Sequence, residues 1–357
     1  MELLSVTMNG GVKPRSEIEG KDNSSEDKSN YKIVRKGDMV YNSMRMWQGA
    51  NGISPCDGIV SPAYTVLMPK QEINNGYFAA LFKSANLINE FRKNSQGMTS
   101  DTWNLKYPQI ETIKIQIPSV SEQDKVSELF GVLDARIVAQ AQLIEALKKY
   151  KRGSLSALFP KKGEITPQYR FAGFTKPWEQ RKLGEVGSVS MCRRIFKEQT
   201  SESGDIPFYK IGTFGGEADA FISKELFEEY KAKYPYPKKG DILISASGSI
   251  GRTVEFTGGN EYFQDSNIVW LNHDEHLDNS FLKCFYSVVK WAGIEGSTIK
   301  RLYNNNILNT VITLPSVAEQ QKIGQYFSTL DRLITLHQHK YDILLSLKNA
   351  LLQQLFI

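Results

Sequence analysis

A long stretch of this sequence occurs twice, and this repeat constrains the fold more than any other feature. Residues 118–123, PSVSEQ, return as residues 315–320, PSVAEQ, so the two copies are offset by 197 residues. The match continues at this offset without a gap, with Lys125, Phe130, Leu133, Asp134, Leu158 and Phe159 matching Lys322, Phe327, Leu330, Asp331, Leu355 and Phe356. A short period would predict a solenoid, whereas a period of this length indicates duplicated domains.

Weaker similarities precede each copy. Residues 36–40 resemble residues 239–243 in sequence, and residues 97–99 resemble residues 296–298. Residues 61–67 occupy the position in the first half that residues 265–271 occupy in the second. The chain is therefore predicted to alternate variable domains with repeated segments. The predicted parts are a variable domain at 1–117, a repeated segment at 118–159, a linker at 160–177, a variable domain at 178–314 and a repeated segment at 315–357.

Each repeated segment is predicted to form one long helix. It starts after a proline, and Glu122 or Glu319 places a negative charge in the first turn, where the helix dipole favours it. Apolar residues then recur in alternating steps of four and three, the spacing typical of a coiled coil. The predicted helix-pair interface consists of Val126, Phe130, Leu133, Ile137, Ile144 and Leu147 with Ile323, Phe327, Leu330, Ile334, Tyr341 and Leu344.

Polar residues interrupt this seam at matching places, Gln140 with His337 and Lys151 with Lys348. Such residues often fix the register and the partner of a coiled coil. One alternative is that each helix packs only on its own domain. The length of the repeat, about five heptads, favours pairing of the two helices. We expect them to run antiparallel, because that arrangement holds the two variable domains apart.

The two variable domains are predicted to be of the α+β class, with strands and helices mixed. Helices are expected near residues 76–94 and 279–291, which carry apolar residues at helical spacing. Short strands are expected at 33–34, 39–41, 63–67, 113–117, 208–211, 241–245, 268–271 and 311–314.

Several loops between these elements carry side chains able to contact nucleic acid. Arginine and lysine suit guanine, asparagine and glutamine suit adenine, and serine suits phosphate. The candidates are Arg45, Gln48, Asn51, Ser247, Ser249, Arg252, Lys300, Arg301, Asn304, Asn305 and Asn306. The net charge of +5 permits a polyanionic partner without identifying one. Ordinary solvated loops are the alternative, so the DNA interpretation depends on the repeat architecture.

Motifs for catalysis or metal binding are not found. The sequence lacks an Asn-Pro-Pro-Tyr or Asp-Pro-Pro-Tyr box, a G-x-G-x-x-G fingerprint and a G-x-x-x-x-G-K-[ST] loop. His273 and His276 flank two acidic residues without a third ligand nearby, which favours a solvated loop. Cys192 precedes Arg193 and Arg194 but has no catalytic partner in the sequence, which favours a structural or incidental cysteine. We expect no catalytic residue, no metal site and no cofactor in this chain.

Composition indicates a soluble globular protein, with 41% hydrophobic and 23% charged residues. The cysteines, Cys56, Cys192 and Cys284, are few and far apart, which argues against disulfides and fits a reducing cytoplasm. No run approaches the roughly 20 apolar residues that a membrane span needs, and the first residues show no secretory signal. We therefore expect a cytoplasmic protein with no membrane partner.

The combined pattern resembles the specificity subunit of bacterial type I restriction-modification enzymes over nearly the whole chain. The runs that carry the resemblance are 118–126, 169–174 with Trp178 and 182–185, 239–243, 296–302, 315–323 and 351–357. The resemblance implies two target-recognition domains separated by two long helices that form an antiparallel coiled coil. Each domain would read one half of a split, asymmetric site on double-stranded DNA.

The resemblance also implies the partners. Two modification subunits, which methylate adenine with S-adenosylmethionine, would dock on the helices, and restriction/translocase subunits using ATP and Mg would complete the complex. The chain itself would be non-catalytic.

The predicted helix length fits a split DNA site. At 1.5 Å per residue, each helix would be about 57 Å long. One turn of B-DNA measures roughly 34–36 Å, so helices of this length would hold the two recognition domains more than one turn apart.

One departure from the family concerns the first domain. The second domain begins with residues 178–185, which have no counterpart in the first, and residues 1–7 align best near 208–213. The segment that the family places before this point is missing, so Met1 begins a truncated or fragmentary domain, or another segment fills the gap.

Three alternatives to the full reader follow. In the first alternative, the chain is an assembly scaffold that has lost DNA reading. In the second, it is a half-specificity protein that reads DNA with its second domain alone. In the third, it is a solitary nuclease or methyltransferase. Binding of a modification subunit without sequence preference would indicate the first alternative. Cofactor- or metal-dependent turnover by the chain alone would indicate the last.

Overall fold

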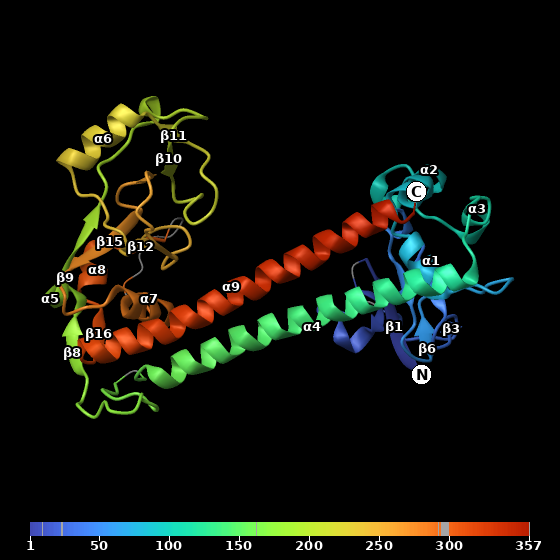
Figure 1. The fold of residues 1–357 in the computed structure, drawn as a ribbon, viewed down its shortest axis with the longest axis horizontal. Helices are drawn as coiled ribbons and strands as arrows, with labels where there is room; N and C mark the ends of the chain where they lie inside the picture. The colour runs from blue at the N-terminus through green and yellow to red at the C-terminus, as the bar shows by residue number, and fades with distance from the viewer. Residues whose placement is uncertain (9, 23, 162, 292, 294–299, 357) are drawn as a thin grey trace. The chain divides into compact units, whose positions relative to one another are not determined.

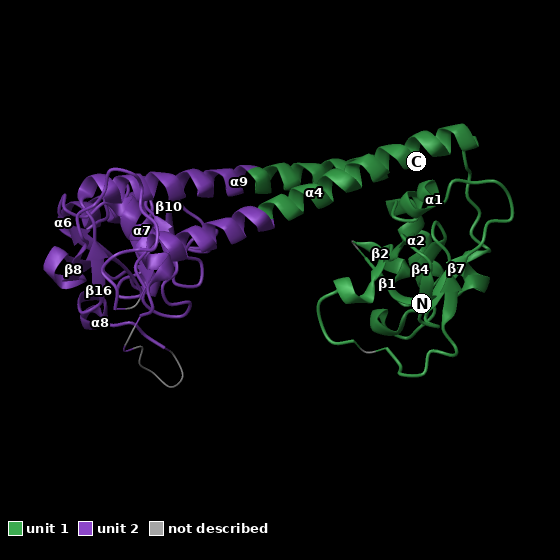
Figure 2. Cartoon of the chain, turned by 90° about the horizontal axis from the view of Figure 1, so that it is seen from below, with its two compact units in different colours: residues 1–144, 337–357 green, residues 145–336 purple. Residues whose placement is uncertain are grey.

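The computed structural model describes residues 1–8, 10–22, 24–161, 163–291, 293 and 300–356 (Figure 1). The chain divides into two compact units, residues 1–144 with 337–357 and residues 145–336 (Figure 2). Each unit contains part of both long helices, so the first unit takes its second stretch from the far end of the chain. Residues 296–299, which belong to one run of the family resemblance, lie outside the described residues.

The repeated segments form α4 (Val120–Leu158) and α9 (Val317–Gln354). Within each unit the two helices lie side by side and antiparallel (Figures 1 and 2). Asp134 pairs with Lys348 in the first unit, and Lys151 pairs with Asp331 in the second. Because Asp134 matches Asp331 in the repeat and Lys151 matches Lys348, the same ion pair is made twice. The predicted antiparallel coiled coil is confirmed.

The matched polar residues of the seam contact each other. Gln140 Nε2 lies 2.8 Å from His337 Nδ1 and donates to the His337 carbonyl at 2.9 Å. Of the predicted interface residues, Phe130, Leu133, Ile144, Ile323, Phe327 and Leu330 are buried, while Val126, Ile137, Leu147, Ile334, Tyr341 and Leu344 are half-buried. These contacts between the helices argue against the alternative in which each helix packs on its own domain alone.

The variable part of the first unit consists of two small sheets and short helices. One sheet has the order β2 (Gly11–Pro14), β1 (Glu2–Thr7), β6 (Gly58–Val60), β3 (Lys32–Val34), and the other β5 (Asn51–Ile53), β4 (Met39–Asn42), β7 (Tyr64–Leu67). The helical elements are η1 (Arg15–Glu17), η2 (Met46–Gln48), α1 (Asn75–Leu81), α2 (Ala85–Asn94), η3 (Ser100–Thr102) and α3 (Tyr107–Ile110). Tyr77 and Phe91 pack in one buried cluster with Phe130 of α4 and Phe356 after α9.

The second unit has more strands. A two-stranded sheet pairs β16 (Val311–Leu314) with β8 (Glu179–Lys182). A four-stranded sheet has the order β13 (Thr253–Glu255), β12 (Ile242–Ser245), β15 (Ile268–His273), β9 (Gly187–Met191). A three-stranded sheet has the order β11 (Phe221–Ile222), β10 (Ile206–Tyr209), β14 (Tyr262–Phe263). The helical elements are α5 (Leu183–Val186), η4 (Lys197–Gln199), α6 (Lys224–Lys233), α7 (Asn279–Val288) and α8 (Asn304–Leu308). Phe281 of α7 packs against Phe159 and Trp178, with ring centroids 5.2 and 5.9 Å apart.

The two units repeat one backbone plan although their variable sequences differ. In the first unit β4 pairs antiparallel with β5 and β7, and in the second β12 pairs antiparallel with β13 and β15. Leu105 N donates to the Ser43 carbonyl at 2.8 Å, and Leu302 N donates to the Ala246 carbonyl at the same distance. We therefore treat β4, β5 and β7 as the counterparts of β12, β13 and β15.

A buried glutamine at the start of each long helix ties that helix to its variable domain. Gln320 Oε1 accepts from Asp278 N at 2.8 Å, and its Nε2 donates to the Pro315 and His276 carbonyls at 3.0 and 2.9 Å. Gln123 repeats this pattern: its Oε1 accepts from Asn74 N at 3.0 Å and its Nε2 donates to a proline carbonyl at 2.9 Å. These bonds explain why the glutamine belongs to both copies of the repeat.

Replacing Gln320 with alanine is expected to lower the free energy of unfolding of the second unit by about 1–3 kcal/mol. The substitution leaves the Asp278 N–H and two carbonyls without their partner in a site where Gln320 is 1% exposed. Urea denaturation and amide exchange in α7 would measure the loss. Gln321→Ala is the matched control because Gln321 is exposed. Equal stability of the two variants would contradict the proposed role of Gln320.

Two sequence predictions about the first unit are wrong. Residues 113–117 are not a strand. Their counterparts form β16, which exists because β8 pairs with it, and within the described residues of the first unit no strand pairs with 113–117. The helix expected at 76–94 is two helices, because the Ser84 side chain accepts from Leu87 N and begins α2.

Candidate nucleic-acid interface

A cleft of about 780 Å³ opens in the second unit where five parts of the chain meet, among them residues 219–220 before β11. The loop between β9 and β10, the end of β10, the loop before β15 and residue 301 line it. Its charged side chains are Arg194, Lys197, Lys210 and Arg301 with Glu202, Asp219 and Asp265. Its uncharged polar side chains are Thr200, Ser201, Gln264, Ser266 and Asn267.

The two amide side chains of the cleft are held in fixed orientations. Gln264 Oε1 accepts from Ile211 N at 2.9 Å, and the Gln264 backbone N–H donates to the Tyr209 carbonyl at 2.9 Å. Asn267 Oδ1 accepts from Ser247 Oγ at 2.9 Å. Because each amide oxygen already accepts a hydrogen bond, the NH₂ groups remain to donate to a ligand. Such donors suit the acceptor atoms of purine edges.

The cations of the cleft are held by weak contacts. Lys210 Nζ lies 2.9 Å from Asp219, and Arg194 Nε lies 4.0 Å from Asp265. The side chains of Arg194, Lys210 and Asp219 are exposed to solvent, and that of Asp265 is partly buried. Arg301 donates to the Ser266 carbonyl at 3.3 Å. Exposed ion pairs contribute little stability, so a phosphate group can replace these carboxylates at small cost. The cleft therefore offers cations for a nucleic-acid backbone beside amides for base edges.

The structure brings some of the predicted residues to this cleft. Arg301 lines the cleft. Ser247 pairs with Arg301 in an isolated β-bridge, and its hydroxyl donates a hydrogen bond that orients the Asn267 side chain. Ser249 and Arg252 lie on the adjoining turn and are exposed. That turn requires glycine, because Gly248 and Gly251 have φ of 63° and 83°.

Other predicted residues lie elsewhere in the second unit. Lys300 is exposed, and the structure does not place it among the residues that line the cleft. Asn304, Asn305 and Asn306 begin α8, which packs against α5 and β9, and they do not line the cleft either.

Sequence reasoning missed most of the cleft. Arg194, Lys197, Lys210, Gln264 and Asn267 were not predicted to contact DNA, although they line it together with Arg301. In the sequence, Arg194 attracts attention only as a basic neighbour of the Cys192 thiol. The remaining residues lie in segments that no local pattern connects.

In the first unit the predicted residues have different environments. Arg45 precedes η2 and Gln48 is its last residue, and both are half-exposed. Asn51 is fully buried on β5, where its Nδ2 donates to the Gly49 carbonyl at 3.1 Å, so its side chain is not accessible to DNA. The prediction of a contact at Asn51 does not fit this burial. The same loop carries a feature that was not predicted: Trp47 packs edge-on against Trp103, with ring centroids 5.2 Å apart.

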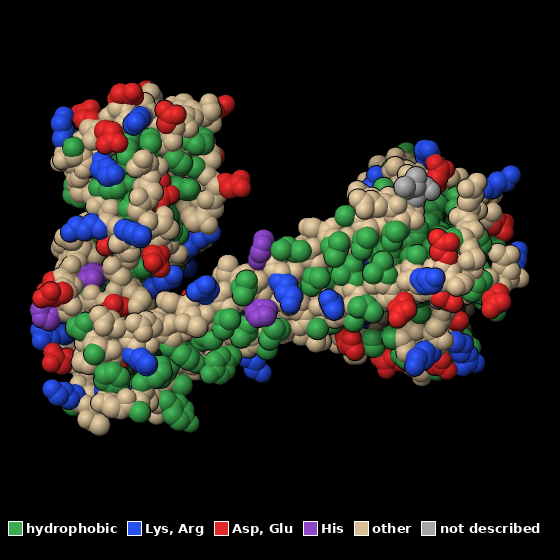
Figure 3. Space-filling view, viewed as in Figure 1, with side chains coloured by type: hydrophobic (Ala, Val, Ile, Leu, Met, Phe, Trp, Pro, Cys, Tyr) green, Lys and Arg blue, Asp and Glu red, His purple; other side chains and the backbone are tan. Residues whose placement is uncertain are grey.

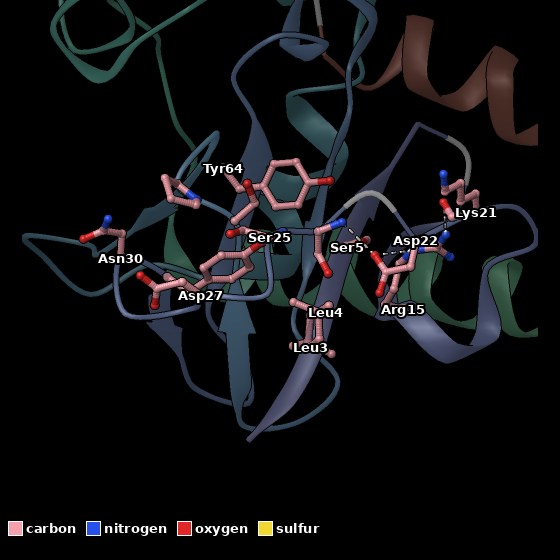
Figure 4. Close-up of a pocket in the computed structure, with 14 residues that line it drawn as sticks. Leu3, Leu4, Ser5, Arg15, Lys21, Asp22, Ser25, Asp27, Asn30 and Tyr64 are labelled. Atoms are coloured by element: carbon pink, nitrogen blue, oxygen red, sulfur yellow. Dashed lines mark hydrogen bonds and ion pairs between the residues drawn. The ribbon is translucent and has the colours of Figure 1, made fainter.

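A pocket of about 520 Å³ lies in the first unit beside β1 and the residues before β7 (Figure 4). The cleft of the second unit lies beside the corresponding elements, β10 and the residues before β15. Here the Arg15 guanidinium is used within its own loop, since it donates to the Gly20 and Lys21 carbonyls at 2.9 and 2.8 Å and lies 3.6 Å from Asp22. A hydrogen bond from the Ser24 backbone lowers the pKa of Asp22, which stays ionised. This pocket is therefore less suited to phosphate than the cleft.

Neither metal nor thiol chemistry is indicated by the described residues. No group of three metal-ligating side chains occurs among them. His273 Nε2 lies 2.7 Å from Asn279 Oδ1, and His276 pairs with Asp274 at 3.1 Å in an exposed loop. Cys192 is buried, and this burial raises the pKa of its thiol to about 12, so the reactive thiolate is not formed near neutral pH. No helix in the described part of the chain is long and apolar enough to cross a bilayer.

Comparison with known proteins gives one consistent family. A family model described as type I restriction modification DNA specificity domain matches residues 5–149 and 175–345. A putative type I restriction enzyme specificity subunit of Haemophilus influenzae is 61% identical over 156 residues, which are 43% of this chain and 40% of that relative. The type I restriction enzyme MjaVIII specificity subunit of Methanocaldococcus jannaschii is 25% identical over 334 residues, 87% of this chain and 76% of that relative.

Solved structures show the same fold at low sequence identity. The S subunit of a type I restriction-modification system from M. genitalium aligns with a TM-score of 0.61 at 17% identity, covering 91% of this chain and 84% of that one. A chain from a study of complex assembly and conformational transition of the type I R-M system aligns with a TM-score of 0.56 at 18% identity, covering 92% and 83%. Two variable domains joined by long helices are therefore an architecture that this chain has in common with known S subunits.

Proposed function

The chain belongs to the family of type I restriction-modification DNA specificity subunits, and on this premise we propose that it reads DNA through the cleft of its second unit. One observation carries the proposal: Gln264 and Asn267 present amide donors in the same cleft as four cationic side chains. Amides identify bases, while cations hold the phosphate backbone and carry most of the affinity.

The proposed target is a split, asymmetric site on double-stranded DNA, with one half read by each unit. Support comes from the repeated backbone plan and from the pocket that lies at the corresponding place of the first unit (Figure 4). The different side chains in the two places would recognise different half-sites, because recognition depends on a few side chains and on DNA shape.

The proposed partners of the helix pair are two modification subunits, with restriction/translocase subunits joining the complex. Hydrophobic side chains gather along the helices on the face seen in Figure 3. The large exposed apolar residues of α4 and α9 include Leu129, Val132, Val138, Leu143, Leu336, Ile343 and Leu347. An exposed apolar stripe of this kind indicates a protein-binding surface. S-adenosylmethionine, ATP and Mg would be bound by those partners in the cytoplasm, and this chain would be non-catalytic.

Adenine methylation mapped across a host genome tests the proposal directly. Co-expression of the chain with a cognate modification subunit is expected to produce a split methylated motif that disappears when the chain is deleted. A matched strain carrying the chain with Gln264→Ala and Asn267→Ala should lose or change one half of the motif only. Absence of new methylation from an intact complex would contradict the proposed reading function and favour an assembly scaffold.

A half-specificity protein is the second candidate function. It is favoured by the first-unit pocket, where Arg15 is held within its own loop and Asp22 and Asp27 add negative charge. In this case only the second unit would read bases. The methylated motif would then have one specific half, or would be symmetric if two copies of the chain acted together.

A further inference from the structure

An exposed phenylalanine lines the cleft of the second unit. Phe196 is 55% exposed, and the apolar side chains of Ile195, Phe208 and Ala220 line the cleft with it. A single exposed ring is ordinary on a protein surface. This ring lies in the same concave place as the amides and cations of the cleft, so a flat apolar face stands beside the polar groups.

Hydrogen bonds fix the backbone that carries the ring. Phe196 N donates to Gln199 Oε1 at 2.9 Å, and Gln199 N donates to the Phe196 carbonyl at 3.0 Å. Gln199 Nε2 donates to the Tyr230 hydroxyl at 3.3 Å, and Tyr230 packs against the buried cluster that contains Phe227 and Tyr262. The loop therefore holds the ring in place before a ligand binds, which lowers the entropy cost of binding.

Two of the four cations of the cleft lie over aromatic rings. The Arg194 guanidinium is 5.4 Å from the centroid of the Phe196 ring, and the Arg301 guanidinium is 5.7 Å from that of the exposed Tyr303. A cation over a ring contributes little at an exposed site. A phosphate group can therefore draw Arg194 away from the ring and leave the ring face to a base.

The concave shape distinguishes two ways in which an aromatic ring contacts DNA. A wedge that enters between base pairs projects from the protein into a groove, whereas a ring that lines a cavity receives a base that has left the stack. Phe196 lines a cleft of about 780 Å³, a volume within the roughly 300–1,000 Å³ of small-ligand sites. The amides of Gln264 and Asn267 line the same cleft, so a stacking face and hydrogen-bond donors share one space.

We propose that the cleft binds a single nucleotide of the second half-site that leaves the duplex stack, with Phe196 as its stacking surface. This inference rests on the proposed reading function and adds how the cleft reaches a base. The base lies against the Phe196 ring, and the NH₂ groups of Gln264 and Asn267 donate to its edge. Arg194 moves to the adjoining phosphate. Stacking on the ring offsets part of the cost of taking the base out of the duplex.

Mismatched duplexes test the proposal on the complex with its modification subunits. Each base pair of the second half-site is replaced in turn by a mismatch, made in either strand. A mismatch removes the pairing that must otherwise be broken, so binding should tighten about tenfold where it frees the extruded base. Binding should weaken at the other positions that the cleft reads. The methylated adenines are measured separately, because a methyltransferase extrudes its own target base.

Substitution of the ring identifies its role. Phe196→Ala should remove the preference for the mismatch and weaken binding of the cognate duplex about 5- to 150-fold, the effect of losing one base–ring stack. Phe196→Trp should retain both, because it keeps an aromatic face. Tyr234→Ala is the matched control: Tyr234 is an exposed ring of the same unit with the Arg193 guanidinium 5.2 Å from its centroid, and it does not line the cleft.

Fluorescence of 2-aminopurine gives a readout that does not depend on affinity. The analogue is placed beside the position that the mismatches identify. Its emission should rise on binding, because it loses a stacking neighbour when the adjacent base leaves the duplex. Phe196→Ala should abolish this rise and Tyr234→Ala should not.

The proposal is wrong if no position outside the methylated adenines prefers a mismatch, or if Phe196→Ala behaves like Tyr234→Ala. Equal weakening of the cognate and an unrelated duplex by Phe196→Ala would also contradict it, since the ring would then make no contact particular to the site. In each case, a complex that still methylates a split motif, and loses one half of it with Gln264→Ala and Asn267→Ala, retains the reading function. The two failures are therefore distinguishable.

Discussion

Replacing Glu319 with alanine is expected to destabilise the second unit by about 3–5 kcal/mol. The Glu319 side chain is 2% exposed and its partner Arg170 is 16% exposed. Glu319 accepts two hydrogen bonds from this guanidinium, and these bonds raise the pKa of Arg170. Without the carboxylate, a largely buried positive charge has no compensating partner, which costs more than the loss of an exposed pair.

The repeat provides a matched control for this substitution. Glu122 occupies the corresponding position of α4 but is exposed, so Glu122→Ala should change stability by less than about 0.5 kcal/mol. Urea denaturation of both variants would measure the difference. Glu319→Gln should fall between the wild type and Glu319→Ala, since it keeps part of the hydrogen bonding. A Glu319→Ala variant as stable as Glu122→Ala would show that the ion pair does not hold the linker on α9.

Arg301→Ala and Lys197→Ala are expected to weaken DNA binding in different ways. Arg301 lines the cleft together with Asn267 and donates to the carbonyl of the preceding Ser266. Loss of a base contact there should cost about 1–3 kcal/mol, roughly 5- to 150-fold, on the cognate site alone. Lys197 lies on η4 at the cleft and would contact phosphate. Its removal should weaken binding to all duplexes and reduce the salt dependence by about 0.9 in the logarithmic slope.

Fluorescence anisotropy of the complex with its modification subunits would separate these effects. The measurement compares a duplex carrying the methylated motif with an unrelated duplex over a range of salt concentrations. Lys224→Ala on α6 is the control, because this lysine is exposed on the same unit and does not line the cleft. If Arg301→Ala and Lys197→Ala both behave like the control, the cleft is not the reading surface.

The architecture of the repeated segments could be predicted from local sequence patterns. The four-and-three spacing of residues such as Phe130 and Ile323 is a local property of a helix, so the seam, the helix lengths and the matched pair Gln140 and His337 followed directly. Short strands such as β4, β12, β15 and β16 were also predicted, because each has a run of β-branched or apolar residues.

The position of the candidate site, in contrast, depends on contacts between distant parts of the chain. The cleft joins Arg194, Lys210, Gln264 and Arg301, and no local pattern relates residues so far apart in the sequence. The burial of single residues could not be predicted from the sequence either. Asn51 has a side chain suited to contact DNA but lies inside the first unit. Residues 113–117 have strand propensity, yet a strand forms only where a neighbouring strand accepts its hydrogen bonds. Glu122 and Glu319 occupy the same place in the repeat, and the presence of Arg170 in the surrounding fold distinguishes their environments.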